Sequence, residues 1–497
     1  MAPRTPRAPR SRAAASRARR RPAESPSQRA AKIRASIARG RLEDLSPLLL
    51  ALNDPSPGLR QTAAVALGIL KDPRARSTLA AALTDPDAAV RASAAEALGA
   101  IGRAESREPL ESALGDPDAR VRVRAAGALG SLADPRSVPA LAVRASDDSP
   151  EVRQAVAAAL GAIGTETAAG ALALLFADSS DRVRREAVLG IGRRTDPGVP
   201  AIVRPFLGDP ARRVRVAAAV VLGRHRDRLS VPLLLERLRV PETWEKPALL
   251  VALGRIGARE AVPALVSASD HPAHWVRVCA LHALGDLGVP EARTAALAHR
   301  RDPSWAVRGA AAIALGAAGG PDELPALLEL LHDVHPWPRR GATYAIGRLG
   351  LSEAAPRIRE ELADPAAEVR LAAIWTLGRL ADDGAREELV RLLYGVRPGD
   401  ADEPAFADGD ADGPLRSDAE SRLFDAAVQA LGRLSHGAPD PFVQRALAEV
   451  RGRLSEEELD RLARLPLPEV DGDRAAPTLR TLFETAIPMS ADDEEPG

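Results

Sequence analysis

The 497-residue sequence has little cysteine and no residue pattern typical of a catalytic centre. It has one cysteine, Cys279, so no disulfide can form within the chain, and a cytosolic setting is expected. No apolar run reaches 18 residues, so no transmembrane helix is expected. The sequence shows no nucleophile–base pair, glycine-rich phosphate loop or zinc spacing, and it therefore predicts neither a catalytic residue nor a cofactor.

Aromatic residues are also rare, at 3% of the chain, and only three lysines accompany 65 arginines. The arginine bias is typical of coding composition more than of chemistry. A chain of this length exceeds one compact core, whereas a stack of repeats escapes that limit because its contacts are local. Few aromatics and many alanines fit thin layers of packed helices.

The sequence contains instead a period of 31 residues. Glycine recurs at eleven positions in this register, namely Gly68, Gly99, Gly130, Gly161, Gly192, Gly223, Gly254, Gly285, Gly316, Gly347 and Gly378. A cation recurs eight residues before each, at Arg60, Arg91, Arg122, Arg153, Arg184, Arg215, Lys246, Arg277, Arg308, Arg339 and Arg370. A fixed period of this length predicts a stacked repeat array.

Each period predicts two helices. The first often carries Val-Pro-x-Leu, as in Val138-Pro139-Ala-Leu141, and proline suits the first turn of a helix. The second opens at Asp-Pro and closes at Leu-Gly, so we expect the aspartate to cap it and the glycine to take the left-handed closing conformation. Counted from the recurring cation as zero, positions −1, +3 and +7 are mostly Val, Ala and Leu, which predicts the buried face.

Asp-Pro, then Val-Arg, then Ala-Leu-Gly resembles HEAT repeats, in particular the short bacterial type named after phycobilin-lyase subunits (PBS-lyase HEAT-like repeats), over residues 41–465. The resemblance implies an all-α fold, an α-solenoid of about 13 two-helix repeats. It also implies a buried ladder between repeats, with structural roles for Asp85 with Arg91, Asp116 with Arg122, Asp209 with Arg215, and Asp364 with Arg370. Repeat 7 departs from the pattern, because Pro241 lacks the aspartate and Lys246 replaces the arginine.

The regions outside the regular array are strongly charged. Residues 1–40 hold twelve basic residues and one acid, whereas the chain as a whole has no net charge. This segment is expected to be a disordered tail; an anion-binding arm, a targeting segment and a mis-assigned start remain open. Residues 41–381 are expected to form eleven regular repeats, 382–435 a repeat with an acidic loop at 395–417, 436–465 a helical cap, and 466–497 an extended acidic tail.

Two patterns resemble metal sites. Asp408, Asp410 and Asp412, followed by Gly413, match the start of a calcium loop, but position 12 is Ala419, which favours a solvated acidic loop. The pairs His271-x-x-His274 and His332-x-x-His335 have no cysteine or acid to complete a tetrahedral site, so they are interpreted as turn histidines. No metal is expected.

The aromatic residues are unevenly placed. All five tryptophans lie in repeats 7–11: Trp244, Trp275, Trp305, Trp337 and Trp375. Position −2 is shared by Trp244, Trp275 and Trp337, and position +5 by His282, Ile313, Tyr344 and Trp375. Seven residues make nearly two turns, so these positions form one stripe on the second helices. By resemblance to HEAT arrays, the second helices line the concave side.

This stripe supports two interpretations. It predicts a protein-binding surface made of Trp244, Trp275, Trp337, Tyr344, Trp375, His282 and Arg340, because exposed aromatic and arginine residues serve as binding hot spots. Alternatively, the rings fill gaps between repeats. In repeats 3–6 the stripe holds Arg120, Arg182, Arg185 and Arg213, diluted by Glu151, which is either a polyanion-binding face or a solvated one.

The favoured function is a non-enzymatic, monomeric scaffold that binds a protein or peptide partner in its concave groove. One alternative is nucleic-acid or polyanion binding through residues 1–40 and the arginine stripe. The other is an enzyme similar to phycobilin lyases that handles a tetrapyrrole chromophore. No membrane association is expected.

Overall fold

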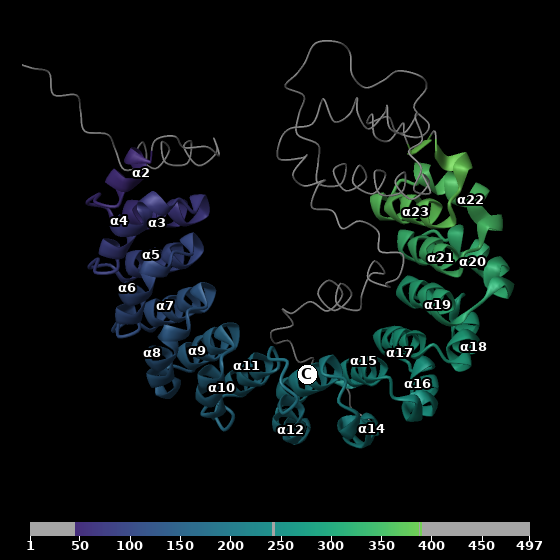
Figure 1. Cartoon of the computed structure of the whole chain (residues 1–497), viewed down its shortest axis with the longest axis horizontal. Helices are drawn as coiled ribbons and strands as arrows, with labels where there is room; N and C mark the ends of the chain where they lie inside the picture. The colour runs from purple at the N-terminus through teal and green to yellow at the C-terminus, as the bar shows by residue number, and fades with distance from the viewer. Residues whose placement is uncertain (1–44, 241–243, 387, 390–497) are drawn as a thin grey trace, which may run out of the picture. The chain divides into compact units, whose positions relative to one another are not determined.

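The computed structural model describes residues 45–389, apart from 241–243 and 387, and the described residues contain helices and turns but no strand (Figure 1). The predicted all-α solenoid is therefore confirmed for this part of the chain. The described helices fall into two compact units, one ending at Arg194 and the other beginning at Thr195. The predictions for 1–40, for the acidic loop at 395–417 with Asp408, Asp410 and Asp412, and for 436–497 lie outside the described residues.

The first unit pairs short and long helices. Its first helices are α2 (Ser46–Ala51), α4 (Arg76–Ala82), α6 (Arg107–Ala113), α8 (Val138–Val143) and α10 (Glu166–Ala173). Its second helices are α3 (Pro57–Leu70), α5 (Ala88–Ile101), α7 (Ala119–Leu132), α9 (Pro150–Ile163) and α11 (Asp181–Ile191). Each second helix packs against the next, so the repeats are held together mainly by this layer.

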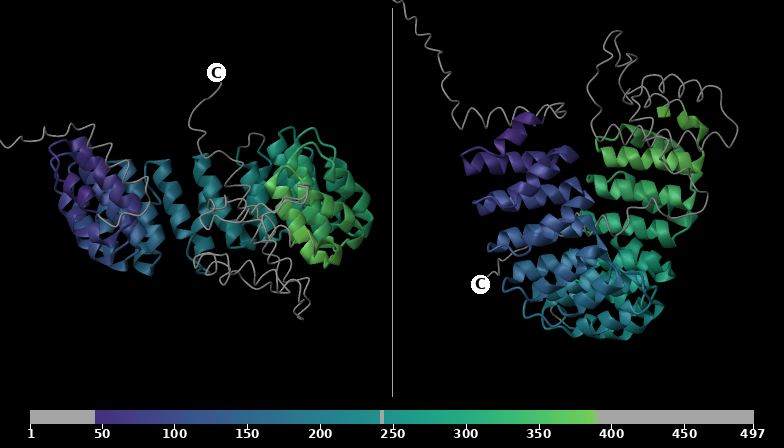
Figure 2. Two further views of the ribbon diagram at one scale, coloured as in Figure 1. Left: turned by 90° about the horizontal axis from the view of Figure 1, so that it is seen from above. Right: turned by 60° about the vertical axis from the view of Figure 1, so that its left-hand side comes forward.

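The second unit continues the same pairing. Its first helices are α12 (Val199–Val203), α14 (Val231–Leu238), α16 (Val262–Ser269), α18 (Pro290–His299), α20 (Leu324–Leu331) and α22 (Ala355–Glu360). Its second helices are α13 (Arg212–Arg224), α15 (Lys246–Ile256), α17 (His274–Leu287), α19 (Trp305–Ala318), α21 (Pro336–Leu349) and α23 (Ala367–Leu380). Within this unit, the second helices α15, α17, α19, α21 and α23 lie on the concave side, and the first helices α16, α18, α20 and α22 lie on the outer side (Figure 1). Figure 2 shows the helices from two further directions.

The core of each repeat follows the predicted face. In α5, positions −1, +3 and +7 are Val90, Ala94 and Leu98, and all three are fully buried. Small residues at +3, +4 and +6 let neighbouring second helices approach closely, so each repeat buries its apolar face against the adjacent repeats.

The recurring glycine has a different role from the predicted one. Gly99 lies inside α5, where a Cβ would sit 2.7 Å from the Cα of Ala128 in the next repeat, so it permits close helix packing. The left-handed residue comes three positions later, as Gly102 (φ 70°). The prediction that the Leu-Gly glycine closes the helix in the left-handed conformation was therefore wrong: α5 continues past Gly99, and Gly192, which does follow the end of α11, is right-handed (φ −68°).

The aspartate of Asp-Pro also differs from the prediction. The side chain of Asp85 accepts a hydrogen bond from the backbone N–H of Asp87 (2.8 Å), and so orders the turn before α5. The cap itself is Asp87, which accepts from the N–H groups of Ala89 and Val90 at 2.8 and 3.2 Å. The helix thus begins three residues after Asp85 rather than at it.

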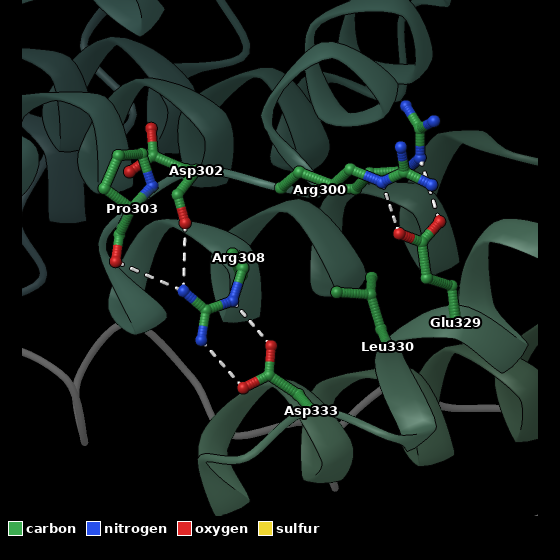
Figure 3. A pocket seen from close by; sticks show the side chains of 8 residues that line it. Arg300, Asp302, Pro303, Arg308, Glu329, Leu330 and Asp333 are labelled. Carbon is green, nitrogen blue, oxygen red and sulfur yellow. Dashed lines mark hydrogen bonds and ion pairs between the residues drawn. The ribbon is translucent and has the colours of Figure 1, made fainter.

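The predicted ladder is present, with a shift in its pairing. Arg91 donates two hydrogen bonds to the carboxylate of Asp116 in the next repeat (2.7 and 2.9 Å), and a third to the carbonyl oxygen of Asp85 in its own repeat (2.8 Å). Figure 3 shows the equivalent Arg308 with Asp333 and the carbonyls of Asp302 and Pro303. The same carboxylate pairing joins Arg60–Asp85, Arg122–Asp147, Arg153–Asp178, Arg277–Asp302 and Arg339–Asp364.

The residues predicted to pair within one repeat therefore meet through the backbone. Arg122, Arg215 and Arg370 donate to the carbonyl oxygens of Asp116, Asp209 and Asp364, respectively. Repeat 7 supplies a different carboxylate to the ladder: the buried side chain of Glu245 accepts a hydrogen bond from Arg215 at 2.6 Å. A carboxylate five residues beyond the usual position thus replaces the missing aspartate.

Candidate protein-binding surface on the second helices

The aromatic stripe begins with a pair of exposed indoles on the concave side of the second unit. Trp244, just before α15, and Trp275 on α17 stack with their ring centres 5.7 Å apart and planes 10° from parallel. Their exposed fractions are 72% and 42%. The Arg212 guanidinium lies 6.0 Å from the Trp244 ring centre, within cation–π range.

A second cluster joins α19 and α21. Trp305 stacks on His335 at 4.0 Å and meets Trp337 edge to face at 6.4 Å. Arg340 lies over both Trp337, at 4.5 Å, and Tyr344, at 5.9 Å. These rings and the guanidinium form a continuous surface across two repeats.

The third cluster extends this surface to α23. Tyr344 packs edge to face against Trp375, with ring centres 5.2 Å apart. The Arg379 guanidinium lies 5.5 Å from the Trp375 ring and donates from Nε to the carbonyl oxygen of Gly347 at 3.0 Å. Arginine thus accompanies the rings at both ends of the stripe and in its middle.

Trp337 and Trp375 are half-buried because each covers a glycine of the preceding second helix. A Cβ at Gly309 would overlap atoms Cδ1 and Nε1 of the Trp337 indole, and one at Gly347 would lie 2.9 Å from Trp375. These two rings therefore pack between repeats, while part of each side chain remains exposed. The gap-filling interpretation therefore holds at these two positions, and partner binding there stays a prediction.

The repeats identify the family. The family model for HEAT repeats matches residues 45–120, 107–182, 169–248, 241–302, 295–347 and 324–397, which together run from 45 to 397 without a gap. The chain belongs to the HEAT-repeat family. No curated protein matches it significantly.

Solved HEAT-repeat structures are similar in fold. Importin beta is 14% identical with a TM-score of 0.52, covering 90% of this chain and 72% of its own. Kap95p, in a structure with RanGDP, is 15% identical with a TM-score of 0.50, covering 86% and 68%. The CpcE–CpcF phycocyanin lyase from Nostoc sp. PCC7120 is 23% identical but has a TM-score of only 0.31, covering 50% and 94%, and adds nothing to the fold assignment.

One residue predicted for the surface of this HEAT-repeat protein is not on it. His282 on α17 is buried, with an exposed fraction of 5%, and its Nε2 has no hydrogen-bond partner among the described residues. Burial lowers the pKa of His282 to about 4. A partner cannot contact this buried side chain, so His282 does not belong to the predicted binding surface.

The buried imidazole makes stability depend on pH. An unfolded histidine, with a pKa near 6.5, binds a proton more readily than folded His282. This group therefore costs no stability above about pH 6.5 and lowers the free energy of unfolding as pH falls from there towards 4. We expect this group to lower the free energy of unfolding by about 2 kcal/mol between pH 7 and pH 5. The variant His282→Leu should lose this dependence in urea unfolding at the two pH values. Equal pH dependence of variant and parent would contradict the burial of a neutral imidazole.

Sequence reasoning missed several cations beside the rings. Position +9, one turn beyond +5, carries Arg224, Arg255, Arg348 and Arg379 on α13, α15, α21 and α23. Arg212 at −3 was also missed, as was the stacking of Trp305, which is one residue out of phase with the other tryptophans. The recurrence of arginine at +9 was a visible signal.

The arginine stripe predicted in repeats 3–6 is less open to a polyanion. Arg120 is exposed but pairs with Asp118 at 2.7 Å, and Arg185 lies 3.5 Å from Glu186. Arg182 is exposed on α11, near enough to Glu151 to help lower the pKa of that carboxyl, after its hydrogen bond with Ser149. Arg213 belongs to the second unit. The carboxylates beside Arg120 and Arg185 favour a solvated face.

One histidine of each predicted pair accepts a backbone hydrogen bond at the start of a helix. Nδ1 of His271 accepts from the N–H of Ala273 (3.1 Å), and Nδ1 of His335 from that of Trp337 (3.2 Å). In the described part of the chain, no three His, Cys, Asp or Glu side chains are grouped so as to hold a metal ion. Cys279 is buried, which raises the pKa of its thiol to about 12. No described helix is both long and apolar enough to cross a bilayer.

Proposed function

We propose that this HEAT-repeat protein is a non-enzymatic scaffold that binds a protein or peptide segment on the concave side of α15 to α23. The observation that carries the proposal is the row of rings from Trp244 to Trp375, with arginine lying over them. Tryptophan, tyrosine and arginine dominate the energetics of protein interfaces because they supply large contact areas and directional hydrogen bonds.

Exposure supports binding over a purely structural role. Trp244, Trp275 and Trp305 keep 72%, 42% and 45% of their surface exposed, which is unusual for the largest apolar side chain. The structural neighbour Kap95p binds RanGDP, an analogy of fold alone. Binding of nucleic acid by the basic residues 1–40 stays a prediction, and so does a cytosolic setting.

The most exposed pair provides the test. Trp244→Ala with Trp275→Ala should weaken partner binding by about 2 kcal/mol or more, on the order of thirtyfold, because a hot spot is removed. The melting temperature should hardly change, since both rings lie outside the buried positions −1, +3 and +7. Full-length protein would be immobilised, and the proteins it retains from a lysate of its source cells would be quantified for variant and parent.

A matched control lies on the outer side of the same unit. Leu229 and Leu233 are exposed apolar residues of the segment 228–238, with exposed fractions of 71% and 40%. The double variant Leu229→Ala, Leu233→Ala should retain the same partner as the parent. Loss of the partner in this control, with retention in the tryptophan variant, would place binding on the outer helices and overturn the proposal.

A further inference from the structure

We infer that the partner presents an acidic segment, in which aspartate or glutamate alternates with apolar residues, to the concave side of the second unit. The inference rests on the proposed function and specifies the chemistry of the partner. It is carried by the charges on the stripe and by three arginines that have no described carboxylate within 4.0 Å.

The stripe is strongly biased towards cations. Positions −3, −2, +1 and +9 share one side of a helix with the rings at −2 and +5, since they lie within about a third of a turn of one another. Across α13 to α23 these positions carry seven arginines, Arg212, Arg213, Arg224, Arg255, Arg340, Arg348 and Arg379, against two carboxylates, Asp286 and Glu368. The whole chain has no net charge, so this surface is more positive than the average of the chain.

Three of these arginines differ from those of the ladder. In ladder arginines such as Arg308, the guanidinium N–H groups donate hydrogen bonds to a buried aspartate side chain and to carbonyl oxygens. Arg212, Arg340 and Arg379 lie over rings instead, 6.0, 4.5 and 5.5 Å from the nearest ring centre, with no described carboxylate within 4.0 Å.

A guanidinium over an aromatic ring still has N–H donors along its edge, in the fork that matches a carboxylate. The ring also holds the side chain in place, so less rotational freedom is lost when a carboxylate binds. Each of the three sites therefore offers an apolar face beside a cationic edge. A segment with alternating acidic and apolar side chains matches that pattern over several repeats.

All five tryptophans of the chain belong to this unit, so their fluorescence reports on this surface. The probe is a tryptophan-free synthetic peptide of repeating Glu-Leu-Asp-Phe units, titrated into the full chain. Its analogue carries lysine in place of every acid. We expect the acidic peptide to bind and the lysine analogue to bind at least tenfold more weakly, with affinity for the acidic peptide falling as salt rises.

Charge reversal then locates the site. Arg340→Glu with Arg379→Glu should weaken the acidic peptide by about tenfold or more, equivalent to 1.4 kcal/mol. Arg239→Glu with Arg259→Glu reverses two exposed arginines in segments of the outer layer and should leave affinity within about twofold. If the reversal lowers the melting temperature, the neutral pair Arg340→Gln, Arg379→Gln replaces it and should weaken binding in the same direction.

The outcomes separate this inference from the proposed function. The inference of an acidic partner is wrong if the lysine analogue binds as tightly as the acidic peptide or more tightly. It is also wrong if Arg340→Glu with Arg379→Glu leaves the affinity for the acidic peptide unchanged. If the tryptophan pair is needed for the cellular partner but the arginine pair is not, the scaffold stands and this inference fails. A single-stranded DNA oligonucleotide that binds more tightly than the acidic peptide, and is lost on reversal, would also overturn it, because the surface would then be a nucleic-acid site.

Discussion

Replacing Arg122 with alanine is expected to lower the free energy of unfolding by about 3–5 kcal/mol, because it leaves a buried carboxylate without its cation. Arg122 donates to both oxygens of Asp147 at 2.8 Å and to the carbonyl of Asp116 at 2.9 Å. Without it, Asp147, which is buried, keeps a hydrogen bond from the N–H of Ser149 at 3.0 Å. One rung of the ladder is lost, whereas the packing of α7 against α9 remains.

Arg120 is a matched control in the same helix. It also pairs with an aspartate, but it is exposed, so Arg120→Ala should cost no more than about 0.5 kcal/mol. Urea unfolding would compare the three proteins, and hydrogen exchange would show whether the loss is confined to α7 and α9. If the free energy of unfolding of Arg122→Ala lies within about 0.5 kcal/mol of that of the Arg120→Ala control, the ladder does not stabilise the array as described.

The ladder also sets the direction of acid unfolding. Burial, the largest single effect, would raise the pKa of Asp147. The hydrogen bonds from Arg122 and from the N–H of Ser149, together with the charges of Arg122 and Arg144, outweigh it, and the pKa is lowered. The rung therefore contributes its stability above pH 4, the ordinary pKa of an unfolded aspartate, and loses it as pH falls below that value. The difference between parent and Arg122→Ala should shrink over the same range.

The second large effect is expected where an indole covers a glycine. Trp337→Ala should cost about 3 kcal/mol, at the low end for tryptophan because the ring is half-buried. Gly309→Ala in the parent should cost about 1–3 kcal/mol, because its methyl group would displace the Trp337 indole. In a Trp337→Ala background the same glycine change should be neutral or stabilising, since alanine favours a helix by about 1 kcal/mol.

A double-mutant cycle measured by urea unfolding gives the coupling directly. Gly127→Ala is the control, because Gly127 lies within α7 with nothing within 4 Å of an added Cβ, and the change should stabilise the protein. Additive effects of Gly309→Ala and Trp337→Ala would show that the indole does not rest on the glycine. The stripe would then be a purely exposed surface.

The period and the buried positions could be predicted from the sequence, because both are local patterns repeated many times. The partners across a repeat boundary could not. Arg91 and Asp85 recur together, but the carboxylate that Arg91 binds is that of Asp116, 25 residues on. Leu-Gly resembles a helix end, yet Gly99 lies three residues before its cap, because close packing needs a small residue there.

The helix positions that form the aromatic stripe could be predicted from the sequence, but the burial of each side chain could not. Position +5 does bring Tyr344 and Trp375 of adjacent repeats together, and position −2 does the same for Trp244 and Trp275. At the same position +5, His282 is buried while Tyr344 and Trp375 are half-buried, because coverage at this edge depends on side chains of neighbouring helices. A single-helix pattern contains no information on those neighbours, so neither the burial of His282 nor the stacking of Trp305 on His335 could be foreseen.

Site-specific photocrosslinking tests most directly whether the concave side of the second unit binds the partner. Glu368, at position −2 of α23, and Glu353, in the outer segment Ser352–Ala354, are both exposed glutamates, and each would be replaced by a photoreactive phenylalanine derivative. In cells producing either full-length variant, we expect a protease-sensitive, nuclease-resistant crosslinked product from position 368 and none from position 353. Crosslinking to a protein from position 353 alone, or a product from position 368 that nuclease removes, would contradict the account.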